Sequence, residues 1–301
     1  MDRTVHSEAN RFCIKDLCTI AGVSRSGYYQ WLHTRTHSAD REKRDALDFQ
    51  SILKEYNYRG YQKGARSIYM RLLHKNIRMN IKKIRRLMKK YGLFCPIRKA
   101  NPYRRMAKAL RTNAVADNQV KREFRSHGPR KILLTDITYI PFNSKFCYLS
   151  VIKDAYTEQI LSHVLSESLE VDFVLQTVHQ LIASYGTSLD ASTLIHSDQG
   201  CHYTSVKFRE LILNYGLRQS MSRRGNCWDN APQESFFGHM KDELSTKIKH
   251  WRSFESVTND INDWIDYYNN DRYQWGLDKL SPNEFYTFIS TGLNPISMVQ
   301  N

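Results

Sequence analysis

The order of strand-like and helix-like segments between residues 131 and 244 limits the fold of this chain more than any other feature. Three β-rich segments come first, KILLTDITYI, which Pro141 bounds, KFCYLSVIKDAY and QILSHVLS, and a helical segment ending at Gly186 follows them. The segment STLIHSD, a helix, LRQSMS and a last helix, QESFFGHMKDEL, complete the series. Consecutive strands followed by alternating helices and strands predict an α/β fold built on a mixed sheet.

Helical signals dominate the first 95 residues. Residues 12–33 predict two short helices, since Gly22 can end the first and Ser24 can cap the second. The string IAGVSRSGYYQWL within them resembles a helix-turn-helix. Residues 41–56 are predicted to be helical, and a further helical pair is predicted over residues 63–75 and 80–91, the second of which Asn80 can cap. We therefore expect an all-α region ahead of the sheet.

The first cysteines and histidines allow an alternative interpretation. Cys13, Cys18, His33 and His37 have the spacing C-x4-C-x14-H-x3-H, which is close to that of a zinc finger. We favour the helix-turn-helix, because Gly22 falls where its turn is needed. Zinc is accordingly not expected as a cofactor.

Charge is spread unevenly over the chain. The formal net charge is +15, yet residues 1–130 carry +21 and the remainder carries −6. Between Arg59 and Arg111 there are 18 basic residues and no acidic one. A solvated basic surface is the simplest explanation, but such a run favours an arm that binds a polyanion, joined to a separate catalytic unit.

One helix concentrates this charge on a single face. In the helix predicted over 80–91, the apolar residues fall on one side and Lys82, Arg85, Arg86 and Lys89 crowd the other. A basic face on a short helix suits contacts with DNA phosphates, so we expect these four residues to bind DNA.

Three carboxylates in the α/β region stand where a fold places ligands. Asp136 lies inside an apolar strand, where a carboxylate is rare unless it is paired or binds a metal. Asp198 closes a strand, and Glu234 sits in the first turn of the last helix. Any one of them alone could be an ordinary cap or turn residue. Together they predict a catalytic site.

Carboxylates in this arrangement suit the transfer of phosphodiester groups. Two magnesium ions about 3.5–4 Å apart can stabilise both the attacking and the leaving oxygen. Magnesium prefers carboxylate oxygens and keeps several waters, so two or three acids suffice. We expect Asp136 to bridge two Mg²⁺ ions, with Asp198 on one and Glu234 on the other, and Mn²⁺ to substitute.

Longer strings carry a resemblance to a known family. The spacing between Asp198 and Glu234 leaves 35 residues, which resembles the Asp-Asp-35-Glu signature of retroviral integrases and related transposases. LLTDITYI, HSDQGCHYTS, SRRGNCWDNAPQESFFGHMKDEL and YYNNDRYQWGLDKLSPNEF resemble the second-frame (OrfB type) transposases of insertion sequences of the IS-three family. The resemblance covers about residues 12–290.

The resemblance implies both a fold and an activity. The fold would be an integrase-type, ribonuclease-H-like mixed-sheet core, preceded by an all-α helix-turn-helix DNA-binding region. The activity would be metal-dependent 3′-end cleavage and strand transfer in DNA transposition. The family also has a basic residue seven positions after the Glu, here Lys241, which we expect to contact DNA. Tyr268, Asn269 and Arg272 match a family motif, for which packing and DNA contact both stay open.

Partners and domain boundaries follow from the same resemblance. We expect binding to transposon ends and target DNA as a homodimer or higher oligomer, and a possible partner encoded by an upstream (OrfA type) frame. The expected domains are a helix-turn-helix-like segment (1–40), a basic helical DNA-binding domain (41–95), a basic linker (96–130), the catalytic core (131–250) and a helical tail (251–301).

Other functions compete with this one. A nuclease or junction resolvase on the same fold would cut without joining ends, and a DNA-binding regulator would do neither. The three acids argue against the regulator. With no apolar run of 18 residues or apolar leader, no membrane is involved, and we expect a cytoplasmic, nucleoid-associated protein.

Overall fold

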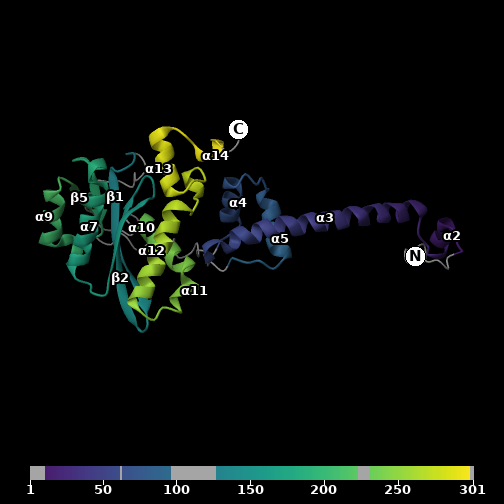
Figure 1. Cartoon of the computed structure of the whole chain (residues 1–301), viewed down its shortest axis with the longest axis horizontal. Helices are drawn as coiled ribbons and strands as arrows, with labels where there is room; N and C mark the ends of the chain where they lie inside the picture. The colour runs from purple at the N-terminus through teal and green to yellow at the C-terminus, as the bar shows by residue number, and fades with distance from the viewer. Residues whose placement is uncertain (1–10, 62, 96–126, 223–230, 299–301) are drawn as a thin grey trace, which may run out of the picture.

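A computed structural model of the chain describes residues 11–61, 63–95, 127–222 and 231–298. The expected linker over 96–130 therefore falls largely outside the described residues. The described chain forms a helical region up to residue 95 and an α/β body after it, as Figure 1 shows. Among the described helices, none combines the length and the apolar character needed to cross a membrane.

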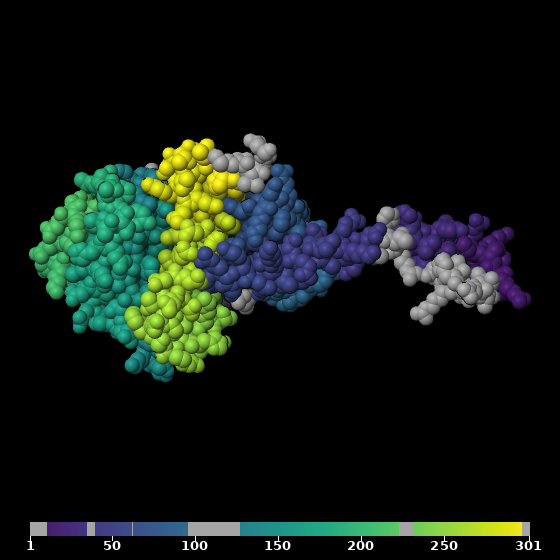
Figure 2. All heavy atoms as spheres, viewed as in Figure 1, coloured from purple at the N-terminus to yellow at the C-terminus, as the bar shows by residue number. Residues whose placement is uncertain are grey.

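The helical region differs from expectation in one respect. Helix α2 covers Ile14–Ile20, and α3 runs unbroken over Arg25–Asn57, where two separate helices were expected. Ser24 caps α3 as predicted, accepting a hydrogen bond from the Gly27 amide at 3.0 Å. No glycine or proline occurs between Tyr28 and Tyr58, so nothing interrupts the helix. Its first half projects from the body and carries α2 at its far end (Figures 1 and 2).

The second half of α3 packs with two shorter helices. These are α4 (Ala65–His74) and α5 (Ile81–Lys90), and Asn80 caps α5 as expected. Their shared core consists of buried side chains from all three helices and the intervening turn: Ile52, Ile68, Leu72, Met79, Ile84, Leu87 and Met88. The apolar side of α5 thus faces inward and its basic side faces outward.

The body is a five-stranded mixed sheet in the order β3-β2-β1-β4-β5. The strands are β1 (Ile132–Phe142), β2 (Lys145–Asp154), β3 (Ile160–Ser166), β4 (Leu194–Ser197) and β5 (Arg218–Met221). The first three are antiparallel, and β4 and β5 run parallel to β1 and to each other. This is the mixed, ribonuclease-H-like order expected from the sequence.

The first hairpin extends further than predicted. We expected Pro141 to end the first strand, but it pairs with Phe146 inside β1. Asn143 and Ser144 then make the turn, with φ angles of 43° and 60°. The left-handed region that such a two-residue hairpin needs is more accessible to asparagine than to most residues.

Helices cover both faces of the sheet. On one face lie α7 (Val171–Tyr185) and α9 (Val206–Asn214), which share a core with Leu133, Ile152 and Ile195. On the other lie α10 (Ala231–Glu243) and α12 (Phe254–Asn270), which pack on Leu149 and Val151 (Figure 1). Short elements complete the body: η2 (Gly186–Ser188), α8 (Cys201–Thr204), α11 (Ser245–Ile248), η3 (Trp275–Leu277), α13 (Pro282–Thr291) and α14 (Pro295–Met298).

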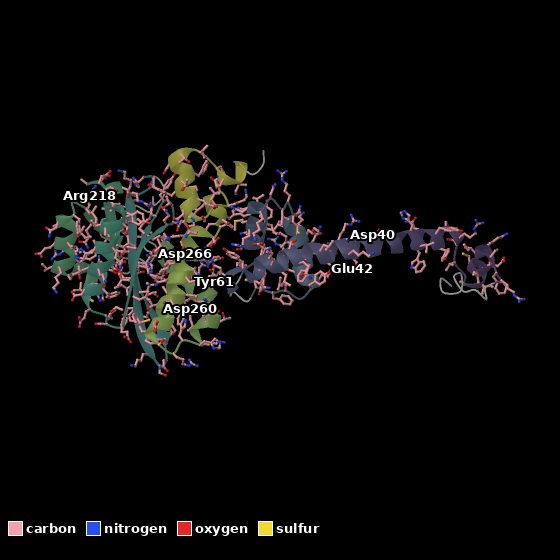
Figure 3. All side chains as sticks on the ribbon, in the orientation of Figure 1. Asp40, Glu42, Tyr61, Arg218, Asp260 and Asp266 are labelled. Carbon is pink, nitrogen blue, oxygen red and sulfur yellow. The ribbon has the colours of Figure 1, made fainter. Side chains whose placement is uncertain are left out.

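The helical region docks on α12 through charged groups. The 3₁₀ turn η1 (Tyr58–Gly60) brings Arg59 to Asp266, with Nη1 and Oδ2 2.8 Å apart. Tyr61 donates a hydrogen bond to Asp263 of the same helix. In Figure 3 Tyr61 lies beside α12, next to Asp260 and Asp266. The position of the helical region relative to the sheet is thus fixed by specific contacts.

Candidate active site

Asp136 lies in the middle of the sheet, on the face that α10 covers. It is directly opposite Val151 of β2, and Val151 packs with Phe236 and Met240 of α10. Residues opposite each other in antiparallel strands project to the same face, so Asp136 also faces α10. Its Oδ1 accepts a hydrogen bond from the Ile137 amide at 2.8 Å. The carboxylate is partly exposed.

Asp198 comes directly after the end of the neighbouring strand, β4, and lies level with Asp136. Leu134 of β1 is in register with His196 of β4, and each aspartate comes two residues later. Neighbouring strands are about 4.8 Å apart, so the two acids start from adjacent backbone positions. Asp198 Oδ1 accepts a hydrogen bond from the Gly200 amide at 2.8 Å. A Cβ at position 200 would come within 2.9 Å of that oxygen, which explains the glycine.

Glu234 lies in the first turn of α10 and is exposed. Lys241 follows it by seven residues, which is about two helical turns, so the two share a helix face. Burial lowers the pKa of Lys241 below 10.5, and the Asp136 carboxylate opposes that shift. The Lys241 ammonium is thus near Asp136. The loop residues Gly225, Asn226 and Trp228, which precede Glu234, lie outside the described residues.

The three acids do not form a closed cluster in this structure. Within the described parts of the chain, no three His, Cys, Asp or Glu side chains are close enough together to hold a metal ion. The pair at the sheet, Asp136 and Asp198, still offers hard oxygen donors on adjacent strands, and these suit a divalent cation such as magnesium. Glu234 would have to approach this pair to complete the set.

Sequence reasoning missed Tyr203, which contacts Thr135, the residue before Asp136. The ring is buried, and its hydroxyl lies 3.4 Å from Thr135 Oγ1. Burial raises the pKa of Tyr203 well above 10, and the carboxylates of Asp136 and Asp198 raise it further. The only sequence signal was its place in HSDQGCHYTS, five residues after Asp198.

The C-terminal motif residues are packed inside the body. Arg272 contacts Glu243 of α10 through Nε at 2.9 Å, and Tyr268 is buried against Phe236. Asn269 makes two hydrogen bonds to the Ile160 backbone, accepting from N at 2.9 Å and donating to O at 2.8 Å. These contacts favour packing, one of the two possibilities that the sequence left open.

The four basic residues expected to bind DNA fall into two groups. Lys82, Arg85 and Lys89 are exposed, and within the described residues none of them has an ion pair. Arg86 instead forms a two-pronged ion pair with Asp45 of α3, at 2.7 and 2.6 Å. Its guanidinium lowers the pKa of Asp45 well below the usual range.

An open groove separates α3 from α5 on this basic side. It has a volume of about 420 Å³ and is lined by Arg41, Arg44, Asp45, Lys83 and Arg86. Four of these five side chains are cationic, so the groove attracts anions.

Known protein families match both the α/β body and the helical region of this chain. The family described as integrase core domain matches residues 126–227, and a second family of the same description matches residues 215–282. The HTH-like domain family matches residues 42–101.

Individual relatives span nearly the whole chain. The putative transposase for insertion sequence element IS986/IS6110 of Mycobacterium tuberculosis is 31% identical, over 84% of this chain and 91% of the relative. The transposase InsF for insertion sequence IS3A of Escherichia coli is 26% identical, over 91% of this chain and 94% of the relative. Among solved structures, the HTLV-2 integrase catalytic core domain in complex with magnesium is 16% identical with a TM-score of 0.42, over 54% of this chain and 99% of that chain.

Proposed function

The chain belongs to the insertion-sequence transposases of the IS-three family, and we propose that Asp136, Asp198 and Glu234 carry out its polynucleotidyl transfer. The register of β1 and β4 is the observation that carries this proposal. It sets two carboxylates level on adjacent strands, beneath the helix whose first turn holds the third acid.

An integrase core depends on divalent metal, and we propose Mg²⁺ as the physiological ion, with Mn²⁺ as a substitute and two ions per site. The residues that would hold the metal are Asp136, Asp198 and Glu234. When bound, the ions would supply Lewis-acid stabilisation of the oxygens that attack and leave the phosphorus. All three side chains offer only oxygen donors, which is the chemistry that magnesium prefers.

The proposed reaction has two steps at DNA phosphorus. Water first attacks the phosphodiester at the transposon end, and the bond to the 3′ oxygen breaks to leave a free 3′-hydroxyl. The oxygen of that hydroxyl then attacks a phosphodiester of the target DNA and bonds to its phosphorus, while the bond from this phosphorus to the target's 3′ oxygen breaks and leaves a 3′-hydroxyl on the target strand. Lys241, an ammonium near Asp136, would hold the phosphate beside the reacting end. Buried Tyr203 would keep water away from the rear of the two aspartates.

The helical region would deliver the DNA. The exposed face of α5 with Lys82, Arg85 and Lys89 would contact phosphates, and the cationic groove beside α3 would extend this surface. The domains would then divide as expected from the sequence, with DNA binding over 41–95 and catalysis over 131–250. We propose a homodimer or higher assembly on the DNA, with an upstream-frame protein as a possible partner.

The test is the conservative variant Glu234→Gln, assayed with labelled element ends and target DNA. The amide keeps the shape of the side chain but removes the charge that a metal ligand needs. Cleavage and joining should fall to background in Mg²⁺ and in Mn²⁺, while DNA binding persists. A variant that still joins ends at an appreciable rate would contradict the proposal. A parent protein that cuts without joining would be a nuclease, and one that only binds would be a regulator.

A further inference from the structure

Lys153 is a buried cation at the edge of the proposed site. It lies in β2, and its side chain is 1% exposed. Its Nζ lies 2.8 Å from Glu158 Oε2 and donates a hydrogen bond of 3.2 Å to the Pro232 carbonyl oxygen. The ammonium also lies 5.7 Å from the centre of the Phe236 ring. Pro232 and Phe236 both belong to the first two turns of α10.

The location of Lys153 relates it to two of the three proposed catalytic acids. It follows Val151, the residue opposite Asp136, by two positions in β2, so both side chains leave the face that Asp136 shares. Its hydrogen-bond acceptor, Pro232, precedes Glu234 by two positions. The lysine therefore connects the strand beside Asp136 to the turn that carries Glu234.

The contacts of Lys153 would not be favoured if they contributed only to the stability of the fold. The amino end of a helix carries a partial positive charge, so an anion there is favourable and a cation is not. Burying an ammonium also costs solvation, which a well-packed apolar side chain would avoid. A contact that carries both of these energetic costs is expected where it keeps a functional segment in position.

We infer that Lys153 is a positioning residue that fixes the first turn of α10, and with it Glu234, relative to Asp136. Lys153 would touch neither DNA nor metal. The inference rests on the proposed function, because it gives Glu234 a role as metal ligand. Without the Lys153 ammonium, the first turn of α10 loses its hydrogen bond to β2, and Glu234 would reach the aspartate pair less often.

The test compares Lys153→Met with the matched control Lys131→Met. Methionine keeps the length and the apolar part of the lysine stem. Lys131 is a half-exposed lysine just before β1, paired with Asp190 at 2.6 Å and far along the strand from Asp136. Two measurements apply: amide hydrogen exchange of the metal-free protein over residues 235–238, whose amides bond to the carbonyls of the first turn of α10, and Mn²⁺ affinity from the electron spin resonance signal of free Mn²⁺.

Lys153→Met should speed exchange selectively over residues 235–238, because the first turn of α10, whose carbonyls protect these amides, opens more easily. It should also weaken Mn²⁺ binding about tenfold, the lower end of the effect of removing a supporting contact behind a metal ligand. Strand transfer should need correspondingly more Mn²⁺ for half-maximal rate, with DNA affinity unchanged. Lys153→Arg, which keeps the cation, should recover most of the Mn²⁺ affinity, and Lys131→Met should match the parent.

A purely structural lysine predicts something else. Lys153→Met would then melt at a lower temperature but exchange evenly along α10 and keep the parent Mn²⁺ affinity, and this result would overturn the inference. If Lys153→Met does not fold, Lys153→Gln, which keeps a shorter neutral donor, supports the same comparison. Glu234→Gln separates the two hypotheses. Parent-like Mn²⁺ affinity and joining in Glu234→Gln overturns both, whereas loss of both there but not in Lys153→Met overturns the inference alone.

Discussion

At the residue scale, the environment of Lys241 indicates whether this residue acts in bond breaking or in holding the substrate. Its side chain is half-buried on α10, and its ammonium is attracted by the Asp136 carboxylate. An ammonium cannot ligate a metal, yet it stands near a proposed ligand. A cation held by Asp136 would weaken this attraction and leave the ammonium available for a DNA phosphate. Lys241 would then bind substrate and take no part in bond breaking.

We predict that Lys241→Ala lowers the rate of strand transfer about tenfold at limiting DNA, in the range expected for one charged phosphate contact. More DNA should recover part of the rate, because the missing contact is one of binding. The measurement is the joining rate as a function of DNA concentration. Lys249→Ala, at an exposed lysine after α11, is the control. Identical curves for Lys241→Ala and the parent would show that Lys241 is only a solvated helix residue.

Which site residues could be predicted from the sequence depends on how far away in the chain their interaction partners lie. Asp136 and Asp198 could be found because a carboxylate inside or at the end of an apolar strand is anomalous locally. Lys153 could not be found in this way. A Lys-Asp pair at the end of a strand is not unusual, and the hydrogen-bond acceptor of Lys153, Pro232, lies 79 residues away. Tyr203 needs the same long-range knowledge of which strands are neighbours.

At the scale of elements, the basic side of α5 contains two kinds of cation. The sequence predicted one face of Lys82, Arg85, Arg86 and Lys89, and helical periodicity was enough for that. It could not predict that Arg86 forms an ion pair with Asp45, which lies on a helix distant in sequence. The Asp45 side chain is only 4% exposed, so this pair belongs to the packing of α3 on α5.

We predict that Lys82→Ala, Arg85→Ala and Lys89→Ala together flatten the salt dependence of DNA binding, by about 0.9 in the log–log slope for each phosphate that the variant no longer neutralises. The triple variant should melt like the parent. Arg86→Ala should do the opposite, changing the slope little and lowering the melting temperature, because buried Asp45 loses its two-pronged partner and keeps only Lys90, at 3.1 Å. The measurements are binding isotherms at several salt concentrations and thermal unfolding. Equal slopes for the parent and the triple variant would rule out α5 as the DNA-binding face.

Element boundaries show the same limit of local signals. Ser24, Asn80 and the turn at Gly22 were located correctly, since caps act within a few residues. The middle of α3 was not recognised as helix. That stretch projects from the body, so it shows no apolar stripe, and only the absence of a helix breaker marks it as helical.

At the scale of the whole molecule, the charge imbalance along the chain has a structural counterpart. Acidic residues of α12 form ion pairs with the helical region. Arg59 lies 2.8 Å from Asp266 and 3.4 Å from Asp263, and 3.1 Å from Asp271, which follows the end of the helix. Asp263 and Asp266 are three residues apart and so lie on one helix face. The sequence predicted a basic and an acidic half, but their mutual contact depends on a docking geometry that no local pattern specifies.

This docking should set the distance between the DNA bound at α5 and the acids at the sheet. We predict that Arg59→Glu, which puts a carboxylate among three others, releases the helical region from α12. Single exposed ion pairs contribute little, but reversing one charge in a network turns every attraction into a repulsion. The radius of gyration from X-ray scattering should increase, and the single thermal transition should broaden or divide. Strand transfer should fall while DNA affinity stays near the parent value.

The charge swap completes the test. In Arg59→Glu with Asp266→Arg, the closest pair is restored with opposite polarity, so compactness and strand transfer should both return in part. Arg59→Gln, which has the size and shape of the glutamate variant but no charge, at a position with a φ of 52°, separates loss of the positive charge from its reversal and should give an intermediate result. If Arg59→Glu scatters and unfolds like the parent, the ion-pair network does not hold the two regions together. If it opens the molecule without slowing strand transfer, the docked arrangement is not the one in which DNA is joined.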